Sequence, residues 1–175
     1  LLGDGVTLYL GGGSSGAITV ASITGTAGGF SSNVVINTTG AVNITGAVGT
    51  DIGTVTITNS GGTTFGGTVT ASTITLTNTT GTVAFNDVLT ASTINTATQA
   101  YNVAINASGS AVTDAVTFSN TGTIALGASA GAQTYTNGIT ATAPSSSTLK
   151  GTINSSNAAM SFGAITLAAN TALNT

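Results

Sequence analysis

The ionisable side chains of this chain are few, and they limit the chemistry it could perform. Four aspartates, Asp4, Asp51, Asp87 and Asp114, are opposed by one cation, Lys150, and Glu, Arg, His and Cys are absent. Carboxylates that converge can hydrolyse glycosides or bind calcium. These four are unevenly spaced, have no Arg or His beside them, and lack the G-x-D repeats of calcium-binding coils. We therefore interpret them as solvent-facing turn residues and expect no enzymatic activity, no metal site and no cofactor.

A glycine-rich segment offers the only other recognisable chemical motif. Residues 11–16, GGGSSG, fit the G-x-G-x-x-G pattern of dinucleotide sites and follow an apolar strand. A pyrophosphate site also needs a helix N-terminus directly after the glycines. The following segment, AITVASITG, has the pattern of a strand. We interpret the glycines as a flexible turn.

Composition excludes several functional classes. Charged residues make up 3% of the chain and the formal net charge is −3, so no basic patch could neutralise nucleic-acid phosphates. The absence of Cys removes disulfides, thiolate metal sites and attached haem. No apolar run reaches the roughly 18 to 20 residues of a membrane helix. We expect one domain over residues 1–175, without nucleic-acid binding or a transmembrane segment.

Two segments at the centre of the chain are near duplicates. FGGTVTASTI begins at Phe65 and FNDVLTASTI begins at Phe85, twenty residues later. A repeat of this length is typical of one coil of a stacked β structure. We expect three pairs to stack between neighbouring coils: Phe65 with Phe85, Val69 with Leu89, and Ile74 with Ile94.

The rest of the chain reads as short strands. Helix formers are scarce, and alternating apolar runs of three to five residues recur from VTLYL at 6–10 to ITL at 165–167. Such runs are short for a sandwich but fit one side of a solenoid coil. The predicted fold is an all-β solenoid with coils of roughly 20 residues, about nine coils in all, forming a rod of about 40 Å. The alternative is a β-sandwich pilin that donates a terminal strand to its neighbour.

Corners are predicted from N-x-x-G spacing after the apolar runs. Asn and Gly tolerate left-handed backbone angles, which a tight corner requires. The predicted corner pairs are Asn37 with Gly40, Asn59 with Gly62, Asn78 with Gly81, and Asn106 with Gly109. A second corner is expected at Ser72 and Thr73, where the apolar alternation changes phase.

Two further features break the regular pattern. Tyr135 and Phe162 each precede an alanine by six residues, as Phe65 does, and are expected to extend one aromatic row. Pro144 cannot donate a hydrogen bond to a central ladder. We expect a loop insertion near residues 143–150, or a slightly longer corner there.

The central repeats, GAQTYTNGITA at 131–141 and the terminal SFGAITLAANTALNT resemble secreted bacterial β-strand-repeat surface proteins. These are similar to filamentous-haemagglutinin and autotransporter passenger domains. The resemblance implies a right-handed parallel β-helix, export to the cell surface, and a role in adhesion, matrix or filament formation. It supplies no catalytic residues. This chain is short for the family and begins with Leu, so we expect a fragment or a filament subunit.

The leading functional hypothesis is an extracellular structural protein whose copies associate end to end through open sheet edges. Alternatives are an adhesin that contacts cell-surface or matrix glycans, and the donor-strand pilin. A third is an ice-binding solenoid, because T-x-T runs such as 54–56 and 75–77 could form a flat array of hydroxyls.

Overall fold

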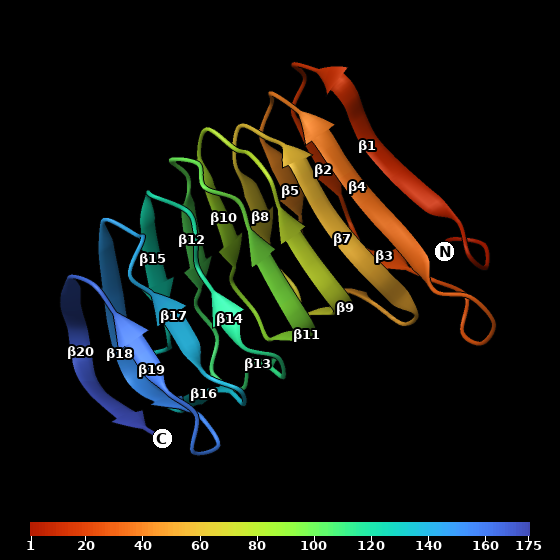
Figure 1. Cartoon of the computed structure of the whole chain (residues 1–175). Helices are drawn as coiled ribbons and strands as arrows, with labels where there is room; N and C mark the ends of the chain where they lie inside the picture. The colour runs from red at the N-terminus through yellow and green to blue at the C-terminus, as the bar shows by residue number, and fades with distance from the viewer.

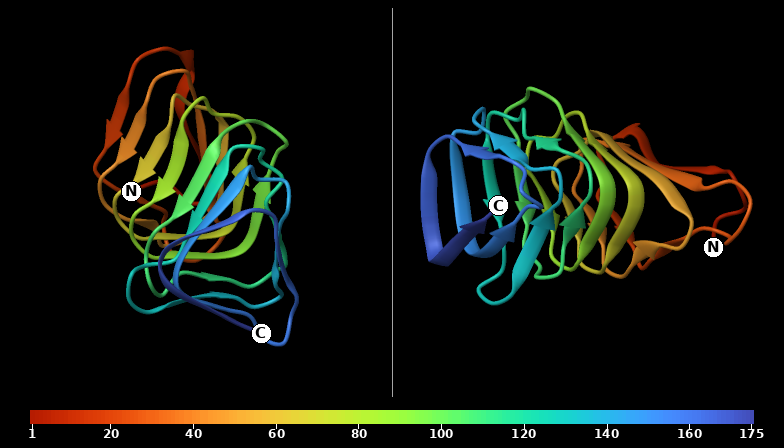
Figure 2. Two further views of the ribbon diagram at one scale, coloured as in Figure 1. Left: turned by 90° about the vertical axis from the view of Figure 1, so that its left-hand side faces the viewer. Right: turned by 60° about the horizontal axis from the view of Figure 1, so that its bottom comes forward.

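A computed structural model describes residues 1–175 and contains strands but no helix. The 20 strands form one continuous parallel sheet that winds into a β-solenoid (Figure 1). There are about eight turns of about 21 residues each, one turn fewer than the sequence predicted. The successive loops follow one axis, and the two termini lie at opposite ends (Figure 2). This coiled parallel sheet excludes the two-sheet sandwich of the pilin alternative.

Each coil has three faces, named here in chain order. The first face is formed by paired strands from successive coils: β1 (Thr7–Ser14), β4 (Ser32–Thr38), β7 (Ile52–Asn59), the second halves of β9 (Val69–Leu76) and β11 (Leu89–Thr96), β14 (Val116–Thr117), β17 (Ile139–Ala141) and β19 (Met160–Phe162).

The second face follows in each coil. Its strands are β2 (Ile18–Val20), β5 (Val42–Ile44), β8 (Thr63–Phe65), β10 (Thr82–Phe85), β12 (Asn102–Ile105), β15 (Thr123–Leu126) and the first parts of β18 (Ser146–Asn154) and β20 (Ile165–Asn174).

The third face completes each coil. It contains β3 (Ile23–Thr24), β6 (Val48–Gly49), the first parts of β9 and β11, β13 (Ala111–Val112), β16 (Ala132–Tyr135) and the last parts of β18 and β20. Four strands therefore bend from one face to the next. In β9 the bend is at Ser72, between Ala71, which pairs with Ala91, and Thr73, which pairs with Thr93.

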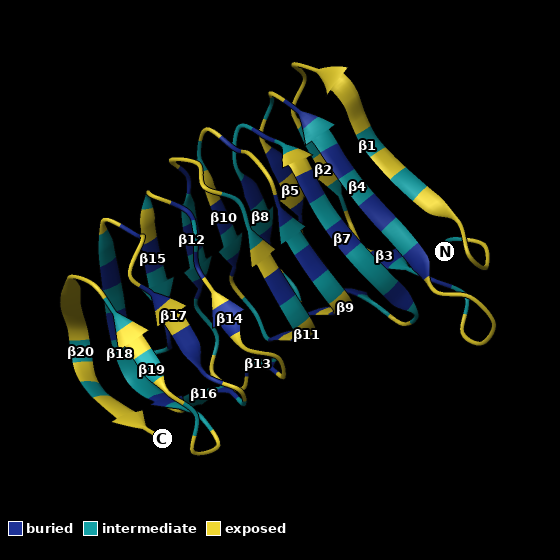
Figure 3. Ribbon diagram, in the orientation of Figure 1, coloured by how far each residue is buried: buried dark blue, intermediate teal, exposed yellow.

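Alternating side chains point into the coil and fill one hydrophobic core of 32 buried residues. In β4, for example, Val34 and Ile36 are fully buried while Asn33 and Val35 are half-buried on the outer side. The β-branched and aromatic residues that favour strands also fill this narrow interior. Figure 3 shows the buried stripes throughout the middle strands and the exposed end strands β1 and β20.

The loop insertion predicted near residues 143–150 is absent. Ser146–Leu149 instead pair in register with Thr123–Leu126 on the second face. Pro144 is buried at the corner just before β18, a position where its missing N–H interrupts no strand ladder. The corner, rather than an excursion of the chain, accommodates the proline.

The aromatic row does not extend to Tyr135 and Phe162. Phe65 and Phe85 lie on the second face, whereas Tyr135 pairs with Val112 on the third face and Phe162 pairs with Ala141 on the first. Coil length varies along the rod, so a fixed spacing in the sequence does not keep a residue on one face.

Candidate functional site

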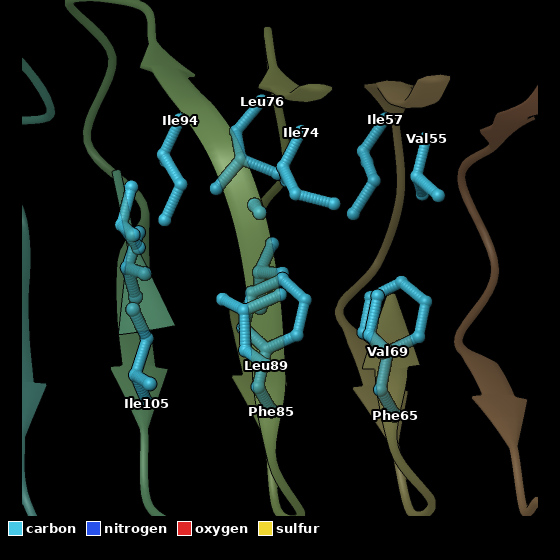
Figure 4. Close-up of a cluster of buried hydrophobic side chains, with 14 of the residues drawn as sticks. Val55, Ile57, Phe65, Val69, Ile74, Leu76, Phe85, Leu89, Ile94 and Ile105 are labelled. Carbon is cyan, nitrogen blue, oxygen red and sulfur yellow. The ribbon is translucent and has the colours of Figure 1, made fainter. Parts of the chain in front are cut away.

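The central repeat places like residues on one another. The rings of Phe65 and Phe85 are parallel within 2° with centroids 4.9 Å apart, which is close to the spacing of neighbouring strands (Figure 4). Leu89 pairs with Val69 and Ile94 with Ile74. These six residues are all buried, so this cluster belongs to the core and cannot contact a ligand.

The corner between the first and second faces contains buried hydroxyl groups. Thr38, Ser60 and Thr79 follow Asn37, Asn59 and Asn78 in the sequence and are at most 4% exposed. Each hydroxyl accepts a hydrogen bond from the N–H of the glycine two residues later, at 3.0 to 3.3 Å. Ser60 Oγ also donates to Thr79 Oγ1 at 2.8 Å. Buried corner backbone groups are therefore satisfied by hydroxyls inside the coil.

The corner glycines serve two different purposes. Gly62 and Gly109 adopt positive φ angles of 125° and 84°. At Gly40 a Cβ would lie 2.3 Å from the carbonyl oxygen of Gly16, and at Gly81 it would lie 2.6 Å from that of Gly61. Gly40 and Gly81 are therefore required by the close approach of the preceding coil.

The four predicted corner asparagines do not use left-handed angles. Positive φ among residues other than glycine occurs only at Thr50, Asp51 and Asn157. Asn37 pairs with Asn59 at the end of the first face. Asn106 lies at the next corner, where its Nδ2 donates to Asn86 Oδ1 at 2.9 Å. The predicted set is therefore divided between two corners of the coil.

Two tyrosines occupy the interior with their hydroxyls bonded. Tyr101 donates to the carbonyl of Leu76 at 2.9 Å, and burial raises the pKa of Tyr101 to about 12. Tyr135 donates to Gln133 Oε1 at 3.0 Å, and burial raises the pKa of Tyr135 well above its usual value. Gln133 in turn donates to the carbonyls of Ile105 and Ala107. These groups are enclosed, so they stabilise the core and do not form a reactive site.

The aspartates lie apart from one another. Asp4 accepts from the N–H of Phe30, Asp87 from that of Val88, and Asp114 from the hydroxyl of Thr93. Asp51 and Asp114 share the corner between the third and first faces, but the bends at Ser72 and Ser92 separate them. Three strand spacings amount to about 14 Å, which exceeds the separation of paired catalytic carboxylates in glycosidases. No three His, Cys, Asp or Glu side chains gather as a metal cluster.

A shallow groove of about 350 Å³ runs along this third corner. Its lining includes Ser31, Asp51, Ser72, Ser92 and Thr113. Ser31 Oγ donates to Asp51 Oδ1 at 2.9 Å, while Asp51 Oδ2 is buried without a partner. A single carboxylate among hydroxyls provides neither an acid–base pair nor a metal ligand set.

The outer side of the first face carries a regular array of hydroxyls. Thr54 and Thr56 lie beside Thr73 and Thr75 of the next coil. These are followed by Thr93 and Asn95, and the column through Asn95 continues to Thr117 and Thr140. The run at 54–56 is therefore in phase with residues 73–75 of the next coil, and the predicted run at 75–77 is two residues out of phase with it.

Exposed large hydrophobic side chains are confined to the two ends of the rod. All of the exposed large hydrophobic side chains lie either in the first coil and the segment leaving it or in β20. They are Leu1, Val6, Tyr9, Phe30, Ile165, Leu167 and Leu173. Leu167 is 63% exposed and Ile165 is 45% exposed, although the equivalent residues in the preceding coil, Leu149 and Ser147, are fully buried. These ends are the candidate functional site.

Sequence reasoning missed the buried hydroxyls at the first corner. The signal was available, since Ser or Thr follows Asn in three of the four predicted corner motifs, at Thr38, Ser60 and Thr79. The ends were predicted as open sheet edges, but the exposed apolar side chains on them were not identified.

The structure has no helix with the length and apolar character needed to cross a membrane. Comparison with protein-family models, with curated proteins and with solved structures finds no match to this chain. The geometry of the solenoid and its ends therefore has to support the functional assignment.

Proposed function

We propose that this chain is a structural protein of an extracellular fibre, matrix or cell-surface layer, and that its copies associate through the open ends of the solenoid. The observation that carries the proposal is the confinement of exposed large hydrophobic residues to the terminal coils. Exposed apolar surface next to unpaired strand edges favours association with another β edge.

The low charge of the chain supports the same function. Proteins that remain monomeric protect their edge strands with Lys, Pro or inward-pointing charges. Here β1 and β20 contain none of these, and Lys150 lies in β18, the strand that pairs with β20. Because repulsion between copies is weak and β1 and β20 lack these protecting residues, association is the favoured outcome at high local concentration.

The experiment is to follow particle size with concentration by light scattering and to image the material by electron microscopy. Filaments should have an axial repeat of about 38 Å per chain, from about eight turns at 4.8 Å. Leu167→Lys places a charge on the exposed end and should abolish elongation. Thr75→Lys, in the middle of the first face, should leave elongation unchanged. A wild-type rod that stays monomeric at all concentrations would contradict the proposal and favour an adhesin.

A second candidate function is binding of ice by the hydroxyl array on the first face. The in-register Thr54, Thr56, Thr73 and Thr75 favour it, because a two-dimensional lattice of equivalent hydroxyls can order water at a surface. Thr75→Lys should then abolish inhibition of ice recrystallisation, while Thr64→Lys on the second face should retain it. Absence of any inhibition in the wild-type protein would exclude this function.

A further inference from the structure

We propose that two copies dock head to tail in one register, with β19 and β20 of one copy pairing with β1 and β2 of the next. This inference rests on the proposed function and specifies its interface. In this register four side-chain columns of the core continue across the junction without interruption.

Two of these columns run along the first face. One begins at Leu8 and, through Val34 and Val55, reaches Met160 in the last coil. The other begins at Leu10 and ends at Phe162 by way of Ile36 and Ala141. All four terminal residues are partly buried and pack against the core. Docking would place Leu8 on Met160 and Leu10 on Phe162.

The other two columns run along the second face. Ile18 pairs with Val42 at the first end, and Ile165 pairs with Ser147 at the last. Val20 pairs with Ile44, and Leu167 pairs with Leu149. Docking would place Ile18 on Ile165 and Val20 on Leu167, which removes from water the two most exposed apolar side chains of these columns.

A second copy of this chain fits both ends because the apolar positions correspond one to one. Within the rod the same columns contain the polar residues Thr63, Thr96 and Ser147, yet all eight terminal positions are apolar. The strand direction is also compatible with head-to-tail docking. Every strand pair in the solenoid is parallel, and a copy docked head to tail extends the ladder with its strands parallel to those of the first copy. Two like ends would have to meet antiparallel, which breaks the columns.

The third face has to rearrange at the junction. The N–H of Leu2 donates to the carbonyl of Thr24 at 2.7 Å, and Ser32 Oγ donates to the carbonyl of Gly3. The first residues of the chain therefore already cover the end of β3. In the proposed register, residues 171–174 of one copy would take that same place beside β3. Docking therefore requires residues 1–3 of the other copy to move off β3, whereas β1 and β2 have no partner on the outer edge.

The register identifies which outward residues meet. Thr19 lies between Ile18 and Val20, and Thr166 lies between Ile165 and Leu167, so these two threonines become direct neighbours across the junction. Neighbouring strands lie about 4.8 Å apart, within the range of Cα separations that a disulfide spans. Because the chain contains no Cys, introduced cysteines can pair only with each other.

The test uses Thr19→Cys and Thr166→Cys as separate full-length variants, mixed under mild oxidation after their circular dichroism spectra match the wild type. The mixture should form a disulfide dimer on a non-reducing gel at several-fold the yield of either variant alone. The control for register is Ala17→Cys mixed with Thr166→Cys, because Ala17 lies two residues from the predicted partner, about 6.8 Å along the strand. That mixture should give little dimer.

The outcomes separate this inference from the proposed function. Dimers formed mainly by Thr166→Cys alone would show that like ends meet, and equal cross-linking through Ala17→Cys would show that the register is not fixed. Either result overturns the inference. Assembly detected by light scattering without the predicted cross-link overturns the register but leaves the structural function standing. Absence of both assembly and cross-link overturns both.

Discussion

The ring of Phe85 lies parallel to the ring of Phe65, with a centroid separation of 4.9 Å that equals the rise from one coil to the next. The two residues hold the same position in neighbouring coils of the second face. The column continues through Ile44 on one side and Ile105 on the other. Each coil contributes one side chain to this column, and that side chain contacts only the coils directly before and after it. The stability of the rod therefore depends on contacts between neighbouring coils.

Replacement of Phe85 by Ala should lower the free energy of unfolding by about 3 to 5 kcal/mol, because it opens a cavity between two coils. Chemical denaturation followed by circular dichroism measures this loss. The matched control is Phe30→Ala, since Phe30 is 79% exposed and its removal should change stability by less than about 0.5 kcal/mol. Equal losses of unfolding free energy for the two variants would show that the Phe85 side chain is not packed in the core.

Replacement of Ser60 by Ala should cost about 1 to 3 kcal/mol, because the variant leaves buried partners without a hydrogen bond. Ser60 Oγ contacts Thr79 Oγ1, Thr63 Oγ1 and the N–H of Gly62. Ser72→Ala is the control, since Ser72 is exposed at a bend. If both variants unfold at the wild-type denaturant concentration, the internal hydroxyls contribute nothing to the corner.

Replacement of Gly40 by Ala should destabilise the fold, because the added Cβ would lie 2.3 Å from the carbonyl oxygen of Gly16. Gly16→Ala is a close control at the same corner of the neighbouring coil, where a Cβ meets nothing within 4 Å. We expect a lower melting temperature for Gly40→Ala and little change for Gly16→Ala. A lower melting temperature for Gly16→Ala than for Gly40→Ala would mean that the two coils lie further apart at Gly40 than they do in the structure.

Stability should fall above pH 10. Burial raises the pKa of Tyr101 from 10.0 to about 12 in the folded state. Between these values the unfolded chain loses a proton that the folded chain keeps, so the free energy of unfolding declines by about 1.4 kcal/mol per pH unit for each such tyrosine. The contribution is fully present below pH 10.

Tyr135 has its pKa raised in the same direction by burial and adds to this slope. Denaturation midpoints measured between pH 8 and pH 12 test the effect. Tyr101→Phe should reduce the slope, because one of the two buried groups no longer titrates. A slope that is the same in the variant and the wild type would mean that Tyr101 is solvated.

Local sequence patterns determined a large part of the fold. The alternating runs VTLYL at 6–10 and ITL at 165–167 correctly indicated β1 and the start of β20, because an alternating strand can bury only one of its sides. Several strands were missed, among them β16, whose buried residues are Gln133 and Tyr135. Alternation of apolar residues cannot reveal a buried glutamine whose amide is satisfied by backbone carbonyls.

The candidate site was predicted only in outline. Open strand edges follow from any solenoid, but the apolar character of the ends depends on which residues of β19 and β20 point inward. Ile165 pairs with Ser147 and Leu167 with Leu149, and both pairings follow the corner at Gly163 and Ala164. The length of that corner sets the phase, and no local pattern in the sequence specifies it.

The sequence by itself determined that this chain is a parallel β-solenoid and that Phe65 and Phe85 share a position, because nearly identical segments bury the same residues when stacked. Only the tertiary structure decided which face each later coil presents, that Tyr135 and Phe162 leave the Phe65 column, and that apolar columns emerge at both ends. The physical reason is that corners absorb extra residues without disturbing the strand ladders. Spacing along the chain therefore fixes the coil locally, whereas the ladder hydrogen bonds between coils fix the register over the whole rod.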